Sequence, residues 1–307
     1  MAYAKIIDID DPGYFRLKSI DQSQLKQFLK NPADWHITVS TTTTSHRRMK
    51  FGTAFHAYLL GTSDVVSLPE GESFRSKDNQ KWRADQLEAG NIIVSYNDMQ
   101  LLKRMKEGIE QTSLMPEYPD YMEIIEQGTK EQCIEWKDRQ TGLMLKAKPD
   151  LIPAGTDYLV DLKTAQKADA ESFAKEVINY GYHIQTVFYR AAVAACKPDA
   201  FDRGSKAPST MQFWVFEKTD ACDWQPFSIS DDNPITNLAA TSIRQALLHR
   251  LMVKKAKEEG YAENTPDPVD AAAKYALRHG FNKKVKEVSF QNWQLLTAEN
   301  MLCDLAS

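Results

Sequence analysis

The sequence predicts a mixed α/β domain in which a mixed central sheet is flanked by helices. Two observations support this prediction. Helical patterns precede residue 132, whereas residues 132–163 change to the two-residue period that is typical of strands. Helices and then two more strand-like segments follow, and this order favours a sheet with helices packed on its faces. With 307 residues, of which 42% are apolar, the chain is long enough to bury one core of normal size.

Three helices are expected ahead of the strands. The first covers Asp21–Leu29 and starts at its aspartate. The second covers Met49–Leu60 and stops at a glycine. The third, Asn97–Glu110, follows Ser95–Asp98, which has the pattern of a capping box. The threonine-rich residues Thr38–Ser45 are expected to form a loop or an edge strand.

The middle of the chain predicts strands that alternate with turns. A turn over Asp138–Gly142 joins the first two strands, and residues 153–157 lead to the third. Two later strands are also joined by a turn. The five expected strands are Gln132–Lys137, Leu143–Lys148, Tyr158–Lys163, Met211–Glu217 and Trp224–Ile229.

Helices return after the third strand. Asp169 is expected to cap a helix that ends near Gly181, and a second helix covers Tyr182–Cys196. The chain beyond Asn233 is expected to be mostly helical. No repeat or low-complexity tract divides the chain, so residues 1–307 are expected to form a single domain with a helical C-terminal segment over about 233–307.

The composition excludes several classes of protein. The longest apolar runs, such as Ala191–Ala195, are far too short to span a bilayer, and the first ten residues lack a signal-peptide pattern. We therefore expect a cytoplasmic protein with no membrane partner. The four cysteines, at positions 133, 196, 222 and 303, form no C-x-x-C pair, so reduced thiols are expected in place of a zinc site.

The net charge of -4 means that any nucleic acid must be held by a local basic surface. Basic residues cluster before the second helix and in the polar segment over residues 71–90, although either cluster could be a merely solvated charged face. Two lysines of the second strand have the same parity as Asp150, so they should face the same groove. The candidate DNA-binding residues are Arg47, Arg48, Lys50, Arg75, Lys77, Lys146 and Lys148.

Two carboxylates and an ammonium are expected to meet at the third strand. Alternate side chains of a strand share a face, so Asp161 and Lys163 point the same way, with Leu162 buried opposite. If the preceding strand pairs with this one, Asp150 comes beside Asp161. Such a set suits Mg²⁺ and phosphodiester hydrolysis, since carboxylates ligate the ion and an ammonium neutralises developing charge. The alternative is a solvated strand end with a surface salt bridge, but the apolar residues around Asp161 favour a buried charge that needs a partner.

Three further residues could belong to this site. Gln185 and Tyr189 are four positions apart on a predicted helix and therefore share one face. His56 lies on a helix of small and apolar residues, and Gly52, one turn earlier, leaves room for close approach. A lone histidine on such a helix is also compatible with a satisfied core residue.

Together these motifs resemble the PD-(D/E)XK nuclease superfamily, in its RecB-like branch. The closer resemblance is to the nuclease domain of RecE-type exonuclease VIII and its phage relatives. It covers about Met49–Glu217, and the nuclease core is expected over about 49–230. The residues that carry it are Phe51–Ala57, Glu131, Trp136, Thr141–Gly142, Lys148–Asp150, Val160–Thr164, Gly181–Gln185 and Phe188–Tyr189.

The resemblance implies roles for the central residues. Asp150 and Asp161 would ligate Mg²⁺, for which Mn²⁺ should substitute. His56 would reach the metal from its helix, and Lys163 would be the catalytic lysine.

It also implies a supporting set of residues. Gln185 and Tyr189 would brace the site or touch DNA. Glu131 would be a metal ligand or support a ligand, with a surface glutamate as the alternative. Lys148 stands where the closest relatives are expected to have arginine, so it would offer DNA a point charge in place of a fork.

The activity implied by the resemblance is that of a DNA exonuclease. It would digest one strand of linear duplex DNA processively, 5′ to 3′, and leave 3′ overhangs for recombination by strand annealing. The implied partners are double-stranded DNA ends, a single-strand annealing protein and further copies of the chain in a ring, in the cytoplasm of a bacterial host or encoded by a phage. A G-x-x-x-x-G-K-[ST] motif is absent, so no ATP-driven motor is expected.

Two alternatives stay open. An endonuclease or a Cas4-like nuclease of the same fold would use the same site, although Cas4-like proteins carry cysteines for an iron–sulfur cluster and the cysteines here are scattered. A non-catalytic DNA-binding phage protein could also keep the fold, but the intact set of Asp150, Asp161 and Lys163 argues against it.

Overall fold

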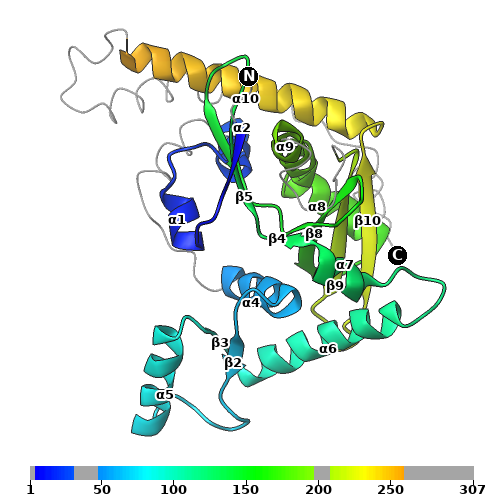
Figure 1. The fold of residues 1–307 in the computed structure, drawn as a ribbon. Helices are drawn as coiled ribbons and strands as arrows, with labels where there is room; N and C mark the ends of the chain where they lie inside the picture. The colour runs from blue at the N-terminus through cyan, green and yellow to red at the C-terminus, as the bar shows by residue number, and fades with distance from the viewer. Residues whose placement is uncertain (1–3, 31–47, 197–207, 259–307) are drawn as a thin grey trace, which may run out of the picture.

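The computed structural model describes residues 4–30, 48–196 and 208–258, and most of its strands lie between the helices (Figure 1). The helices are α1 (Asp11–Arg16), α2 (Gln22–Lys30), α4 (Arg48–Leu60), α5 (Lys77–Glu88), α6 (Tyr96–Ser113), α7 (Tyr121–Gln127), α8 (Ala170–Asn179), α9 (Tyr182–Ala195) and α10 (Pro234–Glu258). The strands are β1 (Ala4–Ile7), β2 (Val65–Ser67), β3 (Ile92–Val94), β4 (Thr129–Lys130), β5 (Cys133–Lys137), β6 (Met144–Ala147), β7 (Leu151–Ile152), β8 (Tyr158–Ala165), β9 (Thr210–Glu217) and β10 (Trp224–Ser230).

The central sheet has five strands in the order β10-β9-β8-β7-β4. The strands β8 and β9 are parallel, with Asp161 opposite Phe213, whereas the other neighbouring pairs are antiparallel. Parallel neighbours need a crossover connection, and α8 and α9 lie in it. The predicted mixed sheet with flanking helices is therefore confirmed.

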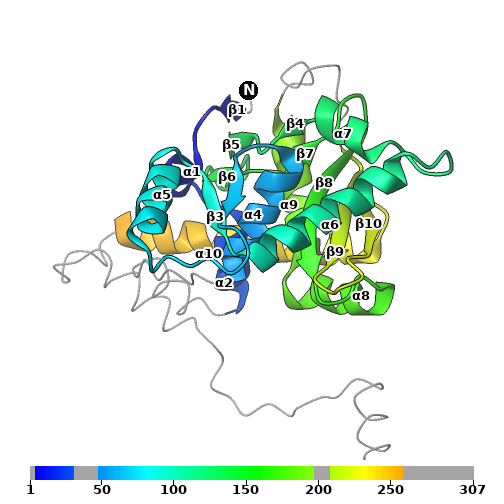
Figure 2. The ribbon, with the colours of Figure 1, turned by 90° about the horizontal axis from the view of Figure 1, so that it is seen from below.

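Helices cover both faces of β8 because its side chains alternate. Leu159 packs in a core cluster with residues of α8, α9 and α10, whereas Val160 and Leu162 pack in a second cluster with residues of α4 and α6. Figure 1 shows α9 and α10 on the side of the molecule opposite α4 and α6, and Figure 2 shows α6 crossing in front of β8 and β9. Since Asp161 and Lys163 have the parity of Leu159, they face the side of α8 and α9.

A second, antiparallel sheet has the order β1-β5-β6. After β1, the chain returns to this sheet at Glu131, whose φ of +46° lies in the left-handed region, and leaves it at residues 148–150. The second predicted strand therefore does not pair with the third, which was the condition for placing Asp150 beside Asp161. β6 pairs with β5, and the neighbour of β8 is the short β7, in which Leu151 lies opposite Val160. Pro149, which has no N–H to donate, follows the end of β6 and prevents its ladder from continuing.

Local signals predict most of the element ends. Asp169 caps α8, Ser95 caps α6, and Asp21 accepts the N–H of Gln24 at the start of α2. The sequence predicts no helix where α5 lies, because α5 buries none of its residues and so lacks an apolar period. The prediction for Thr38–Ser45 and the part of the C-terminal prediction beyond residue 258 lie outside the described residues.

Two findings concern the predictions on membrane spans and on the cysteines. Within residues 4–30, 48–196 and 208–258, no helix combines the length and the apolar character that a membrane span requires. Cys133, Cys196 and Cys222 are free thiols, and Cys303 lies outside the described residues.

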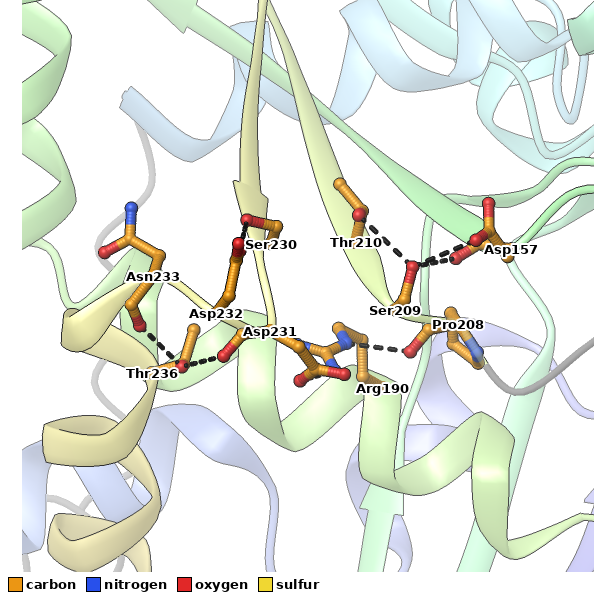
Figure 3. A network of polar contacts seen from close by, with 10 residues as sticks. All are labelled: Asp157, Arg190, Pro208, Ser209, Thr210, Ser230, Asp231, Asp232, Asn233 and Thr236. Carbon is orange, nitrogen blue, oxygen red and sulfur yellow. Dashed lines mark hydrogen bonds and ion pairs between the residues drawn. The ribbon is translucent and has the colours of Figure 1, made fainter.

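A polar network anchors α9 at one end of the central sheet. Arg190 of α9 donates through Nε to the carbonyl oxygen of Pro208 at 2.9 Å and forms an ion pair with Asp231 (Figure 3). The hydroxyl of Thr236, at the start of α10, donates to the carbonyl oxygen of Asp231 at 2.9 Å. The network therefore joins α9 to the residue pair that precedes β9 and to the turn between β10 and α10.

Candidate active site

Strand β8 presents a carboxylate and an ammonium on one face. Asp161 is only 1% exposed, and its Oδ2 forms an ion pair with Nζ of Lys163. Leu162, between them, is fully buried in the core cluster on the opposite face. The side chains of β8 therefore alternate between the two faces as predicted. The buried charge of Asp161 has an opposite charge beside it, which a buried carboxylate needs.

The side chain of Asp150 is held next to Asp161 by a hydrogen bond from the backbone of β8. It directly precedes β7, and its Oδ2 accepts the N–H of Leu162 at 2.8 Å. The short β7 runs beside β8, so this bond places the Asp150 carboxylate at the strand that carries Asp161. The two carboxylates therefore meet as expected, although β7 and not β6 brings them together.

His56 approaches the same point from α4, on the other face of β8. Its Nδ1 lies 3.5 Å from Oδ1 of Asp150, and its Nε2 lies 3.0 Å from the carbonyl oxygen of Leu162. Burial acts to lower the pKa of His56, but the nearby Asp150 carboxylate outweighs it, and the net result is a raised pKa. Both ring nitrogens of His56 therefore have partners at the junction of β7 and β8.

Helix α9 braces the site from the other side. Gln185 is buried, and its Nε2 donates to Oδ1 of Asp161. Tyr189, one turn further on, packs in the core cluster beside α9, and burial raises the pKa of its hydroxyl well above the usual value. The geometry of Gln185 fits a bracing role, whereas Tyr189 is buried and does not present its ring at the surface.

The two carboxylates differ in their affinity for protons. Burial, and then the charge of Asp150, raise the pKa of Asp161 to about 6 against the opposing effect of Lys163. For Asp150, burial is outweighed by His56 and then Lys163, so its pKa is lowered. Asp150 therefore stays ionised, while Asp161 takes up a proton when the pH falls below about 6.

Two aromatic rings that the sequence pattern does not predict at the site lie beside the ammonium of Lys163. Its Nζ lies 4.7 Å from the ring centroid of Tyr182 and 5.9 Å from that of Phe213. Tyr182 precedes Gln185 by three residues on α9, so the helical spacing that relates Gln185 to Tyr189 could have found it. Phe213 lies opposite Asp161 on β9, and only the register of the two strands reveals that neighbour.

Glu131 is near the site through its backbone but not through its carboxylate. Its N–H donates to the carbonyl oxygen of Asp150 at 2.9 Å, whereas its Oε2 lies 3.7 Å from Nζ of Lys148. In the described part of the chain, no three His, Cys, Asp or Glu side chains gather closely enough to form a ready ligand set. The positive charge beside Asp161 is instead the ammonium of Lys163.

The predicted DNA-binding role of Lys146 is wrong. This side chain is 1% exposed, and its Nζ donates to the carbonyl oxygens of Tyr14 and Leu17 at 2.9 and 3.0 Å. It also lies 4.6 Å from the ring centroid of Tyr14 and 3.9 Å from Oδ2 of Asp21. The parity argument fails because β6 ends at Ala147, and because α1 and the residues that follow it cover this face of β6.

Lys146 should therefore govern stability. Replacing Lys146 by methionine leaves two buried carbonyl oxygens without their donor, so the free energy of unfolding should fall by about 2–4 kcal/mol. Urea denaturation at pH 7 measures the effect. Lys137→Met, on the exposed end of β5, is the matched control and should change stability by no more than about 0.5 kcal/mol. Unchanged stability of Lys146→Met, together with weaker DNA binding, would restore the original assignment.

Three of the remaining basic residues, Lys148, Arg75 and Lys77, lie in the described part of the chain. Lys148 forms an ion pair with Asp11 of α1, so an acidic residue of the N-terminal segment neutralises it. Arg75 and Lys77 are exposed at the start of α5, which packs beside β3. Arg47, and the side chains of Arg48 and Lys50, lie outside the described part of the structure.

A mixed sheet that presents Asp150 beside Asp161 and Lys163, with helices on both faces, defines a PD-(D/E)XK-type domain. The chain belongs to the family described as "PDDEXK-like domain of unknown function (DUF3799)", whose sequence profile matches residues 21–265. Curated proteins give no significant match.

The solved structures that match this chain include two that are named as exonucleases. A candidate exonuclease from Eubacterium rectale has a TM-score of 0.51 and 15% sequence identity, over 94% of this chain and 98% of that chain. The alkaline exonuclease of Laribacter hongkongensis has 13% identity over 76% of this chain and 100% of that chain, but its TM-score of 0.27 is too low to support an argument. The first likeness supports the fold and no more, because the sequence identity is low.

Proposed function

We propose that this protein is a magnesium-dependent DNA exonuclease that acts on linear duplex DNA. The observation that supports this most directly is the pair of buried carboxylates, Asp150 and Asp161, with the partly exposed Lys163 at the junction of β7 and β8. Two carboxylates and an ammonium at such a junction are a costly arrangement unless they serve a ligand or a reaction.

The donor set fits Mg²⁺ in its chemistry. Asp150 and Asp161 offer carboxylate oxygens at the junction of β7 and β8, and His56 approaches Asp150 from α4. Hard oxygen donors are the ligands that Mg²⁺ prefers, and Mn²⁺, which accepts oxygen and imidazole donors, should replace it. When bound, the ion would lower the pKa of water and stabilise negative charge on the phosphate.

The residues around these donors hold them in place. Gln185 fixes the orientation of Asp161 by its hydrogen bond, and the N–H of Leu162 fixes Asp150. Lys163, held between Asp161 and the ring of Tyr182, would turn its ammonium toward a phosphate oxygen or a water molecule and neutralise charge that develops there. The raised pKa of Lys163, to which Asp161 contributes against the effect of burial, keeps this group protonated at neutral pH.

The finer features of this proposal rest on the resemblance to RecE-type exonucleases. They are 5′ to 3′ polarity, processive digestion, 3′ single-strand overhangs, a single-strand annealing partner and a ring oligomer. Contacts to the phosphate backbone are proposed for Lys148, once Asp11 is displaced, and for the basic residues Arg47, Arg48, Lys50, Arg75 and Lys77.

The decisive experiment compares two forms of one DNA sequence. With Mg²⁺, a linear duplex should be degraded to nucleotides and single strands, whereas a covalently closed circle of the same sequence should survive, because an exonuclease needs an end. Addition of a chelator should stop digestion of the linear form, and Mn²⁺ should restore it. Rapid cutting of the closed circle would make the protein an endonuclease, and intact linear DNA in the presence of Mg²⁺ would refute the proposal.

A further inference from the structure

A row of aromatic rings leads from the active-site lysine toward the surface. Tyr182 stacks on Phe213 and Phe173, with centroid distances of 5.6 and 6.0 Å, so its ring is held by neighbours on the core side. Lys163 lies over the ring of Tyr182. The next ring in the row is that of Tyr180, whose centroid is 5.7 Å from that of Tyr182.

Tyr180 differs from the other rings because it is 57% exposed. It is the C-terminal cap of α8, where its N–H donates to the carbonyl oxygen of Glu176 at 2.9 Å. Its own carbonyl oxygen accepts a hydrogen bond from Nζ of Lys26, also at 2.9 Å. Gly181, with a φ of +68°, makes the turn that brings Tyr180 back beside Tyr182. The backbone is therefore held on both sides, while the ring itself remains exposed.

The position of this ring suits a nucleobase. The two distances along the row place the Tyr180 ring within about 10 Å of Nζ of Lys163, close enough for a strand whose phosphate meets Lys163 to reach it. Bases stack on exposed aromatic rings without regard to sequence, and a ring on a fixed backbone loses little freedom on binding.

We propose that Tyr180 is a stacking platform for an unpaired base next to the phosphate that is cleaved. The ligand is thus the single-stranded end of a DNA strand, and the inference rests on the proposed nuclease function. A base paired within a duplex has both faces covered, so the platform favours an end that is frayed or already resected. Single exposed aromatic residues are common on protein surfaces, so the experiment compares Tyr180 with another exposed tyrosine.

The test measures binding without cleavage. The probe is a duplex with a short single-stranded end in which 2-aminopurine occupies the terminal unpaired positions, and EDTA prevents hydrolysis. Stacking on a tyrosine ring quenches the fluorescence of 2-aminopurine. We expect Tyr180→Leu to weaken binding by about 5- to 50-fold and to abolish the quenching, whereas Tyr180→Phe should retain both, because stacking requires the ring and not the hydroxyl.

A matched control is Tyr118→Leu, since Tyr118 is 51% exposed and lies between α6 and α7, away from Lys163. It should bind and quench like the wild type, and circular dichroism should show that all variants are folded. Unchanged affinity and quenching in Tyr180→Leu, while the wild type still digests linear DNA, would overturn the platform alone. A wild type that neither binds the probe nor digests DNA would overturn the proposed function as well.

Discussion

Asp161→Asn is expected to lower the rate of Mg²⁺-dependent DNA digestion by about 10³-fold or more. A metal ion contributes several kcal/mol of charge stabilisation, and Asp161 is one of the two carboxylates that would hold it. Asparagine has nearly the same shape and can still accept the hydrogen bond from Gln185, so the fold around β8 should persist. Single-turnover digestion of linear DNA measures the loss, and turnover at the wild-type rate would remove Asp161 from the site.

The same substitution should change how stability depends on pH. The folded protein holds the Asp161 proton more tightly than the unfolded chain does, because the folded pKa is about 6 and the usual pKa of an aspartate is 3.8. The stability that comes from this proton is fully present below pH 3.8 and is lost as the pH rises through about 6. Asparagine cannot ionise, so in EDTA at pH 8 the variant should be more stable than the wild type by about 1–3 kcal/mol.

The advantage of the variant should shrink as the pH falls through 6, and urea denaturation at several pH values measures it. Addition of Mg²⁺ at pH 8 should stabilise the wild type and not Asp161→Asn, since the metal binds the ionised carboxylate. A variant that is less stable than the wild type at pH 8 would mean that the ion pair with Lys163 outweighs the burial of the charge.

Lys163→Ala should reduce kcat by about 10²- to 10³-fold and change the affinity for DNA by no more than about threefold. The Lys163 side chain is only 17% exposed beside Asp161 and Tyr182, so it offers little surface for ground-state contacts, and its charge should matter chiefly where negative charge develops. Steady-state kinetics and binding in EDTA separate the two effects.

Loss of Lys163 should also move the pH–rate profile upward. Lys163 opposes the effects that raise the pKa of Asp161, so its removal should raise that pKa further and make Asp161 ionise at higher pH. Lys167→Ala, on the exposed segment after β8, is the matched control and should behave like the wild type. A loss confined to KM would make Lys163 a phosphate anchor.

The sequence by itself determines the features that depend on neighbouring residues. The alternation of β8 decides that Asp161 and Lys163 share a face, because a strand cannot place them otherwise. The caps at Ser95 and Asp169 decide where α6 and α8 begin, since each side chain bonds an N–H three residues further on. The class of fold also follows from the order of helical and strand periods along the chain.

Only the tertiary structure decides the features that join distant segments. Lys146 looks like a groove residue by parity, but carbonyl oxygens of Tyr14 and Leu17, more than a hundred residues away, turn it into a buried anchor. Asp150 meets Asp161 through β7, a strand too short to show a period. Tyr180 comes beside Tyr182 because Gly181 turns the chain, and Tyr182 lies under Lys163 because α9 packs against β8. Strand register and helix packing are set by the burial of whole apolar faces. The free energy of this burial depends on the assembled core, so no local stretch of sequence reveals it.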